Sequence, residues 1–340
     1  MNPKPSLNSG SLADARVLIA RANEFATWVV RMARNFAAQD WLLCFYFTTL
    51  AFALLFGTGP NRDAGLLRVE TDIAVLLAGL ILVRGELLAP NSFASALIYR
   101  GTIFGATVCS YFQLREILPA VSSRAIDASL LAFDMRVFHY EPAIAWDAFV
   151  TPGTTEWFAF FYFGHFLLLA AHVLPFMFFG SDRNLMPRFA LGVFVVFCVG
   201  HLLYLVVPGY GPFQFLEGQF EHPLTGGVFW KWVLHAVEVG GARKDIFPSL
   251  HTAVPVFFAL FSFMHRRYKP FNFTWPITAF FASQMVIATM FLRWHYLIDI
   301  VAGLALAGVA VWASCKLEPM EQERRTRLGL PPIFASLRSQ

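Results

Sequence analysis

The sequence predicts an all-helical protein that crosses a membrane about eight times. Of its 340 residues, 57% are hydrophobic and only 14% are Asp, Glu, Lys or Arg, whereas a soluble domain carries about 25% charged residues. The mean hydropathy is +0.56. This composition excludes an ordinary soluble domain and indicates a polytopic membrane protein. The net charge of +4 is modest, so the composition does not indicate a nucleic-acid partner.

Eight apolar stretches are candidates for membrane-crossing helices, which need about 20 mostly apolar residues each. They lie at 40–58, 66–83, 101–114, 157–179, 188–207, 252–264, 274–292 and 296–315. The stretches 101–114 and 252–264 are short, and we expect the second to begin a few residues earlier than the apolar run itself.

The distribution of Lys and Arg predicts how the chain is oriented in the membrane. If both termini face the cytoplasm, the segments after Val83, Phe179 and Met264 are cytoplasmic, and most of the 26 Lys and Arg residues lie inside. The positive-inside rule favours this orientation. Three of the remaining basic residues, Arg293 and the pair at 243–244, each lie within a few residues of a histidine.

Two polar motifs interrupt the apolar sequence. The first reads Phe-Pro-Ser-Leu-His-Thr at 247–252, and the second reads Arg-Trp-His-Tyr-Leu-Ile-Asp at 293–299. An even number of crossings separates the two motifs, so we expect both at the outer membrane surface.

The second motif contains a histidine and a carboxylate that can act together. His295 and Asp299 are four residues apart, so on a helix they share a face. The carboxylate can accept a hydrogen bond from one ring nitrogen and leave the other as a nucleophile or base. An ionisable pair this close to hydrocarbon is costly, which favours a functional role. His251 of the first motif would then be the proton donor.

If the reaction is a transfer at phosphorus, the site also needs positive charge or hydrogen-bond donors around the phosphate oxygens. Arg293, Arg243 and Lys244 are the candidate cations, and Ser249 adds a hydroxyl at the start of a helix. Each has an alternative interpretation that stays open. The three basic side chains could contact lipid headgroups, and Ser249 could be a simple N-cap.

Two further residues are candidate headgroup contacts. Tyr210 follows the fifth apolar stretch, and His165 lies in a helix that begins outside. Their alternatives are the interfacial aromatic belt for Tyr210 and packing with one hydrogen bond for His165. Neither motif supplies a cluster of carboxylate, His or Cys ligands, so we expect no metal and no cofactor.

The ordered pair of motifs resembles a known family. Pro-Ser-Leu-His, followed about 40 residues later by Arg-x-His-Tyr-x-x-Asp-x-x-Ala-Gly, is similar to the type 2 phosphatidic acid phosphatase superfamily. Within it, the chain most resembles the inositol phosphorylceramide synthases and their bacterial relatives. The resemblance covers residues 126–308. It implies that His295 attacks phosphorus, Asp299 orients His295, and His251 protonates the departing oxygen, before water or an acceptor hydroxyl resolves the phosphohistidine.

The chain departs from the broad superfamily in two places. A Lys-x6-Arg-Pro motif is missing, and the corresponding stretch reads Val-Pro-Gly-Tyr-Gly-Pro at 207–212. Leu250 also replaces the glycine of the phosphatase Pro-Ser-Gly-His. Both departures resemble the synthase-like branch. They leave open which cations bind the phosphate.

The resemblance divides the chain into four expected parts. These are an interfacial amphipathic segment (1–38), an N-terminal transmembrane module (39–120), a catalytic domain of the type 2 phosphatidic acid phosphatase kind (121–316) and a cytoplasmic tail (317–340). In the first part, Val17, Phe25 and Trp28 can share one helical face. That helix either lies on the membrane surface or packs against the protein. The tail beyond Glu318 is expected to be solvated and partly disordered.

The resulting expectation is a lipid phosphotransferase in a membrane, such as the bacterial plasma membrane, with its site facing outward. Its substrate would be a lipid phosphoester and its acceptor a hydroxyl or water. The first alternative is a lipid phosphate phosphatase that releases inorganic phosphate. The second, of another class, is a non-catalytic lipid transporter or scaffold. The sequence does not indicate the lipid, the headgroup or the oligomeric state.

Overall fold

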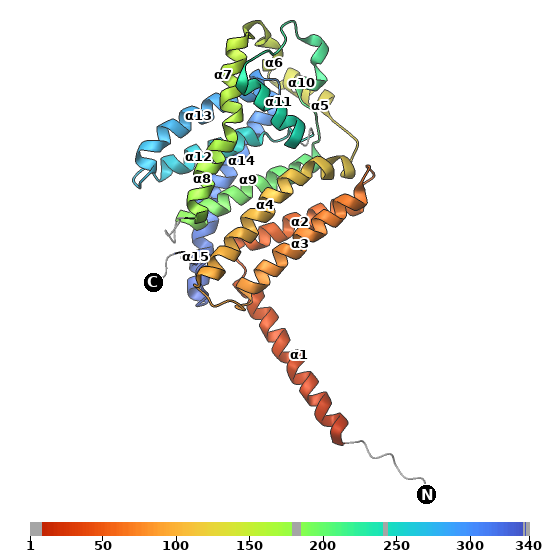
Figure 1. Ribbon diagram of the computed structural model, residues 1–340, viewed down its shortest axis with the longest axis vertical. Helices are drawn as coiled ribbons and strands as arrows, with labels where there is room; N and C mark the ends of the chain where they lie inside the picture. The colour runs from red at the N-terminus through yellow and green to blue at the C-terminus, as the bar shows by residue number, and fades with distance from the viewer. Residues whose placement is uncertain (1–8, 179–184, 241–243, 336, 338–340) are drawn as a thin grey trace.

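The computed structural model describes residues 9–178, 185–240, 244–335 and 337, and within them every regular element is a helix (Figure 1). The elements in chain order are α1 (Ser9–Asn35), α2 (Ala38–Leu55), α3 (Arg62–Arg84), α4 (Phe93–Val121), α5 (Asp127–Val137), α6 (Pro142–Ala145), η1 (Asp147–Phe149), α7 (Pro152–Phe163), α8 (His165–Phe178), α9 (Leu185–Val206), α10 (Pro212–Phe215), η2 (Glu217–Gln219), α11 (Val228–Gly240), α12 (Leu250–Met264), α13 (Phe271–Phe291), α14 (Leu297–Trp312), η3 (Ala313–Leu317) and α15 (Glu318–Arg327).

Five helical segments of the described chain are long and apolar enough to cross a membrane. They are Ala38–Leu55, Pro152–Phe178, Leu185–Val206, Phe271–Phe291 and Leu297–Arg327. Helix α12 is apolar but shorter. Helices α3 and α4, which contain two of the eight predicted spans, carry several charged residues each. The chain is therefore an integral membrane protein whose described part is helical and contains five candidate crossings.

The C-terminal helices pack around α12, which contacts α13, α14 and α9. Phenylalanine fills this core: Phe189, Phe257, Phe258 and Phe261 are fully buried. Helix α12 begins at Leu250, inside the first motif, as expected. Its first turn is therefore built from the motif residues themselves.

The N-terminal helices α2, α3 and α4 pack against one another, and α2 and α4 also contact α9. One hydrophobic cluster runs through both groups, from Leu43 and Leu118 to Phe194 and Phe257. A buried ion pair joins Arg84 to Asp40, with 2.6 Å between Nε and Oδ2. The N-terminal module therefore packs directly against the C-terminal helices.

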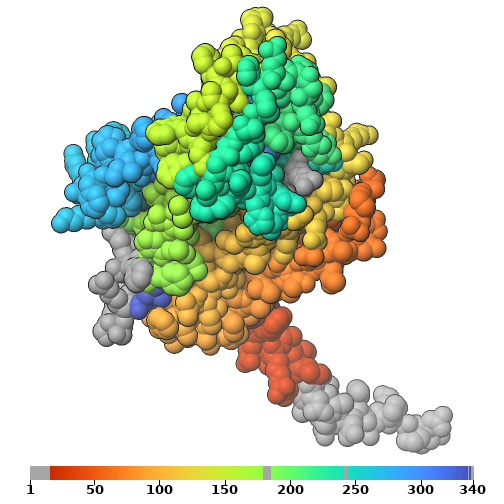
Figure 2. Space-filling view, turned by 45° about the horizontal axis from the view of Figure 1, so that its top comes forward, coloured from red at the N-terminus to blue at the C-terminus, as the bar shows by residue number. Residues whose placement is uncertain are grey.

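Helix α1 projects away from the bundle (Figures 1 and 2). Its apolar residues Val17, Leu18, Ile19 and Phe25 are all more than half exposed. Contact with the bundle is made near its C-terminal end, where Nε1 of Trp28 donates to the carbonyl of Gly85 at 2.9 Å. The interpretation as a helix packed against the protein is therefore wrong for most of its length.

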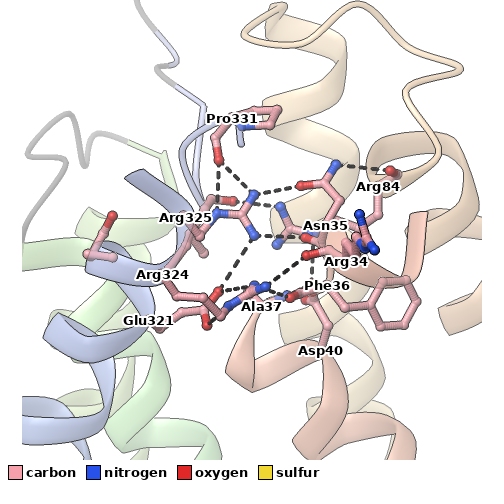
Figure 3. A network of polar contacts seen from close by, with 12 residues as sticks. Arg34, Asn35, Phe36, Ala37, Asp40, Arg84, Glu321, Arg324, Arg325 and Pro331 are labelled. Carbon is pink, nitrogen blue, oxygen red and sulfur yellow. Dashed lines mark hydrogen bonds and ion pairs between the residues drawn. The ribbon is translucent and has the colours of Figure 1, made fainter. Parts of the chain in front are cut away.

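The expectation of a solvated C-terminal tail is wrong for residues 318–335. Glu318, Arg325, Ile333 and Phe334 are all at least 95% buried. The tail returns along the bundle and holds the junction between α1 and α2 through arginine hydrogen bonds (Figure 3). The many charged residues of the tail favoured exposure to solvent, but these guanidinium groups donate hydrogen bonds to backbone carbonyls instead.

Candidate active site

The two motifs meet where α12 and α14 begin. The backbone N–H of Ser249 donates to the carbonyl of Asp299 at 3.0 Å. Gly303 makes this approach possible, because a Cβ there would lie 2.6 Å from the carbonyl oxygen of Ser249. The rings of His251 and His295 then lie 6.3 Å apart, centroid to centroid.

His295 and Asp299 are paired, but not in the way the spacing predicts. His295 precedes α14, which starts at Leu297, so the two residues do not share a helical face. Instead, the turn after α13 directs the ring toward Asp299, with backbone N–H groups of Trp294 and His295 bonded to the carbonyl of Thr289. Nδ1 of His295 lies 3.4 Å from Oδ2 of Asp299.

The Asp299 carboxylate sits at the first turn of α14 and is fully buried. Its Oδ2 accepts the backbone N–H of Tyr296 at 2.9 Å. Its Oδ1 is buried and has no hydrogen-bond partner, and the same holds for Nδ1 of His295. A small shift that brings Nδ1 of His295 into hydrogen-bonding geometry with Oδ2 of Asp299, now 3.4 Å away, would give this ring nitrogen a partner.

Burial dominates the electrostatics of His295. It lowers the pKa of the imidazole from 6.5 to about 4, against the opposing effects of the Asp245 carboxylate and the Ile246 carbonyl. The ring is therefore neutral at pH 7 and retains a lone pair. Asp245, which the motif analysis did not single out, lies close enough to act on the site by its charge.

His251 is held between two other rings. It stacks on Tyr162 of α7, with centroids 4.3 Å apart and planes 11° from parallel. The ring of His165, at the start of α8, lies 4.5 Å away. His165 is buried, and its Nδ1 has no partner. The structure places His165 beside His251, but His165 does not line the cavity described below.

A cavity of about 450 Å³ opens beside the two motif histidines, which both line it. Its walls are largely aromatic and include Tyr111 of α4, Tyr162 of α7, and Tyr210. Helix α11 covers one side and lies across the face of the molecule next to α4 (Figure 2). The N-terminal module and the segment between α9 and α12 therefore both contribute to the cavity.

The two described cations proposed for phosphate binding are engaged elsewhere. Arg293 pairs with Asp147 at 2.6 Å, donates to the carbonyl of His222 at 2.6 Å, and lies over the ring of Phe220. Lys244 donates to backbone carbonyls at the end of α4, at 3.0 and 3.2 Å. Neither residue lines the cavity. Direct phosphate binding by Arg293 would require its ion pair to break.

The remaining predicted site residues have surroundings that differ from one to the next. Ser249 occupies the N-cap position of α12 without a side-chain cap, and its buried Oγ has no hydrogen-bond partner. Tyr210 lines the cavity. Arg243 lies outside the described residues. Among the described residues, no group of three or more His, Cys, Asp or Glu has the arrangement of a metal site.

Helix α5 positions both sides of the site with two carboxylates that the sequence reasoning missed. Asp127 accepts the backbone N–H groups of Tyr210 and Gly211, at 2.9 and 2.8 Å, and the hydroxyl of Tyr296 at 3.2 Å. Asp134 accepts the first N–H groups of α14, from Leu297 at 2.7 Å and the next residue at 3.0 Å. Their spacing of seven residues, which puts both on one helix face, was the available signal.

The comparisons with known proteins agree with this geometry. A model of the PAP2 superfamily matches residues 128–313, which is more than half of the chain. No curated protein and no solved structure matches the chain. The chain therefore belongs to the PAP2 superfamily, the type 2 phosphatidic acid phosphatase superfamily. Membership indicates a membrane enzyme of the phosphoester type, acting on a lipid phosphate or phosphodiester.

Proposed function

We propose that the protein transfers the phosphate or phospho-headgroup of a lipid phosphoester to an acceptor hydroxyl through a phosphohistidine at His295. This is the reaction class of the inositol phosphorylceramide synthase-like branch that its motifs resemble. The observation that carries the proposal is that His295, which has the buried Asp299 behind it, lines a cavity of about 450 Å³ together with His251.

The chemistry follows from the two histidines. The neutral ring of His295, whose Nδ1 lies 3.4 Å from Oδ2 of Asp299, attacks phosphorus through its other nitrogen. The bond from phosphorus to the lipid alcohol breaks, and His251, which must be an imidazolium when the anionic substrate is bound beside it, gives its proton to that departing oxygen and becomes neutral. The acceptor hydroxyl then attacks the phosphohistidine, its proton goes to His251, and His295 leaves neutral. The net result exchanges one ester bond to phosphorus for another.

The phosphate oxygens need donors that the missing Lys-x6-Arg-Pro motif does not supply. The N-terminus of α12 offers backbone N–H groups and the positive end of the helix dipole. The unpartnered Oγ of Ser249 lies at the same helix start. We therefore assign the phosphate oxygens to this helix start, and we retain Arg293, Arg243 and Lys244 only as residues that tune its charge.

The proposed topology has about eight crossings, with both termini in the cytoplasm and the cavity facing outward. The asymmetry of Lys and Arg supports this orientation. We further propose that 1–38 is an interfacial segment, 39–120 a transmembrane module and 121–316 the catalytic domain. The amphipathic and exposed character of α1 supports the first assignment.

Product identity tests the proposed function. The full chain is reconstituted with a lipid phosphoester, with and without an alcohol acceptor, and diacylglycerol, inorganic phosphate and the new phosphoester are measured. A transferase forms the new phosphoester and no inorganic phosphate. Vanadate should inhibit, because it mimics five-coordinate phosphorus.

Three results would contradict the proposal. Inorganic phosphate formed without any acceptor would identify a phosphatase. No product from any donor would favour a non-catalytic transporter or scaffold. Full activity in His295→Ala would remove the nucleophile from the scheme. His235→Ala is the matched control, because His235 lies exposed on α11 and outside the cavity lining.

A further inference from the structure

The charges around the cavity are the opposite of those expected for a site that receives a doubly charged phosphate. Three carboxylates line it: Glu217 of η2, Glu238 of α11 and Asp245. Among the described lining residues there is no Lys or Arg. A phosphate monoester carries about two negative charges at neutral pH. It would be repelled by these carboxylates unless cations offset them.

The aromatic content of the cavity adds a second, independent feature. Seven of the lining side chains are Phe, Tyr or Trp, contributed by α4, α7, α8, α10 and the connecting segments. Aromatic faces bind cations, and quaternary ammonium groups are commonly held in such aromatic cages. Aromatic rings together with carboxylates are therefore the surroundings that an ammonium group prefers.

Two of the three carboxylates lie on the exposed side of the cavity, and the third lies close to His295. Glu217 and Glu238 are exposed, whereas Asp245 is half-buried and close enough to His295 to oppose the fall of its pKa. His295 itself is at least 95% buried on the cavity wall. A phosphorus atom at His295 thus has carboxylates on the solvent side, where the headgroup of a lipid phosphodiester would extend.

We propose that the cavity binds a lipid phosphodiester whose headgroup carries an ammonium, such as an amino-alcohol ester, rather than an anionic phosphate monoester. This inference rests on the proposed function and names its donor. The ammonium pairs with the carboxylates, and the aromatic rings enclose it. The single negative charge of the diester needs only the neutral donors at the start of α12. A cavity of 450 Å³ suits a headgroup, because small-molecule sites span about 300–1,000 Å³.

A donor comparison provides the first test. The full chain in neutral detergent micelles, with the same alcohol acceptor in every assay, is given phosphatidylethanolamine, phosphatidylcholine, phosphatidylglycerol or phosphatidic acid, and diacylglycerol release is measured. We expect kcat/KM for at least one ammonium donor to exceed that for the two anionic lipids by about ten-fold or more. Equal or faster release from phosphatidylglycerol or phosphatidic acid would overturn the inference while leaving the proposed function intact.

The proposed function fails separately from the inference. If no donor releases diacylglycerol, or if His295→Ala releases it as fast as the natural chain, the proposed chemistry is wrong. A preference among donors is then not interpretable as headgroup selection by this site, and the inference falls with it.

A charge-neutralising variant tests the residues themselves. In Glu217→Gln/Glu238→Gln, the ratio of kcat/KM for the ammonium donor to that for phosphatidylglycerol should fall by about ten-fold. The matched control is Glu221→Gln, an exposed carboxylate of the same connection that does not line the cavity. An unchanged ratio in the double variant, or an equal fall in the control, would contradict the assignment.

A competition experiment tests the cation directly and requires no variant. Choline and its uncharged isostere 3,3-dimethylbutan-1-ol have nearly the same shape. We expect choline to inhibit diacylglycerol release competitively and the isostere to inhibit at least about ten-fold more weakly. Equal inhibition would show that shape rather than charge is recognised. Acceleration by choline would assign the ammonium to the acceptor and overturn its assignment to the donor.

Discussion

The central residues of the site are two neighbouring buried groups, each of which has one buried polar atom without a hydrogen-bond partner. Nδ1 of His295 and Oδ1 of Asp299 are both unpaired and sealed from solvent. A buried polar atom without a partner costs about 1–3 kcal/mol, so the fold tolerates this arrangement at some expense. The cost is understandable if the pair tightens when phosphorus is attacked and the ring becomes positively charged.

Asp299→Asn tests this pairing at the residue level. The amide oxygen can still accept the N–H of Tyr296, so the helix start should fold, but the negative charge that stabilises the ring is lost. We expect kcat for diacylglycerol release to fall by on the order of 10³–10⁴-fold with little change in thermal stability. Asp63→Asn, an 89% exposed carboxylate, is the control. A loss of less than ten-fold in Asp299→Asn would contradict the pairing.

The pH dependence of the reaction follows from the pKa of His295. Because burial lowers this pKa to about 4, the ring keeps its lone pair until the solution is strongly acidic. We expect kcat/KM to stay level from neutral pH to about 5 and to fall below it. An acidic limb near 6.5 would contradict the assignment of His295 as nucleophile.

The effect of acid on folding stability must be distinguished from its effect on kcat/KM. A histidine whose folded-state pKa is lowered is protonated first in the unfolded chain, so its contribution to stability is lost as the pH falls from 6.5 toward 4. Activity is therefore measured again after return to pH 7. Full recovery excludes irreversible unfolding, and an unchanged helical circular dichroism signal at the low pH assigns the limb to ionisation.

The residues to which we assign chemical roles could be identified from the sequence because they lie in short motifs. His251, His295 and Asp299 are each within a few positions of a distinctive neighbour. Tyr162 and Asp245 could not be identified in this way, because their contribution to the site depends on contacts across the fold. The stacking of Tyr162 on His251 joins α7 to α12, and no local pattern reports such a contact.

At the scale of elements, α5 acts as a brace between two segments that form the site. Asp127 holds the Tyr210–Gly211 turn, and Asp134 caps the start of α14. Gly211 has φ of +82°, and a Cβ there would lie 2.3 Å from the carbonyl oxygen of Trp294. The turn can therefore approach the second motif only with glycine at this position.

Asp127→Ala tests the brace. It leaves two backbone N–H groups and the hydroxyl of Tyr296 without their acceptor. We expect the free energy of unfolding in detergent to fall by about 2–4 kcal/mol, together with a loss of activity. Asp127→Asn keeps one acceptor oxygen and should lose less than half as much. If the alanine variant unfolds within about 0.5 kcal/mol of the natural chain, the brace is not a stabilising element.

Helix positions were predicted well where the sequence is uniformly apolar and poorly where charges are buried. The stretch 188–207 corresponds closely to α9 (Leu185–Val206), whereas 101–114 covers only the middle of α4 (Phe93–Val121). Arg100 interrupts the apolar run, yet it is 99% buried within α4. Tertiary contacts accommodate this charge, and hydropathy alone cannot anticipate them.

At the scale of the whole molecule, helix α15 is joined to the C-terminal end of α1. Arg324 donates to the carbonyls of Arg34 and Phe36, and Arg325 donates to the carbonyl and side chain of Asn35 (Figure 3). These carbonyls belong to the end of α1, where a helix lacks intrahelical partners. The tail therefore caps α1 and fixes the point from which it projects.

Arg325→Ala tests this connection. The change leaves the acceptors of Asn35 and Pro331 without their guanidinium donor inside a buried network. We expect the free energy of unfolding to fall by about 2–4 kcal/mol and proteolysis to become faster between α1 and α2. Arg327→Ala is the matched control, because Arg327 lies on the same helix with its side chain 71% exposed. Equal effects of the two variants would contradict the capping role.

The most direct test of the account is to trap the phosphohistidine. The full chain is mixed with a donor labelled at phosphorus, quenched in alkali, where phosphohistidine survives, and separated from lipid. We predict label on the natural chain that acid releases, and none on His295→Ala. Absence of label on the natural chain under turnover, or label that persists in His295→Ala, would contradict the assignment of His295 as the nucleophile.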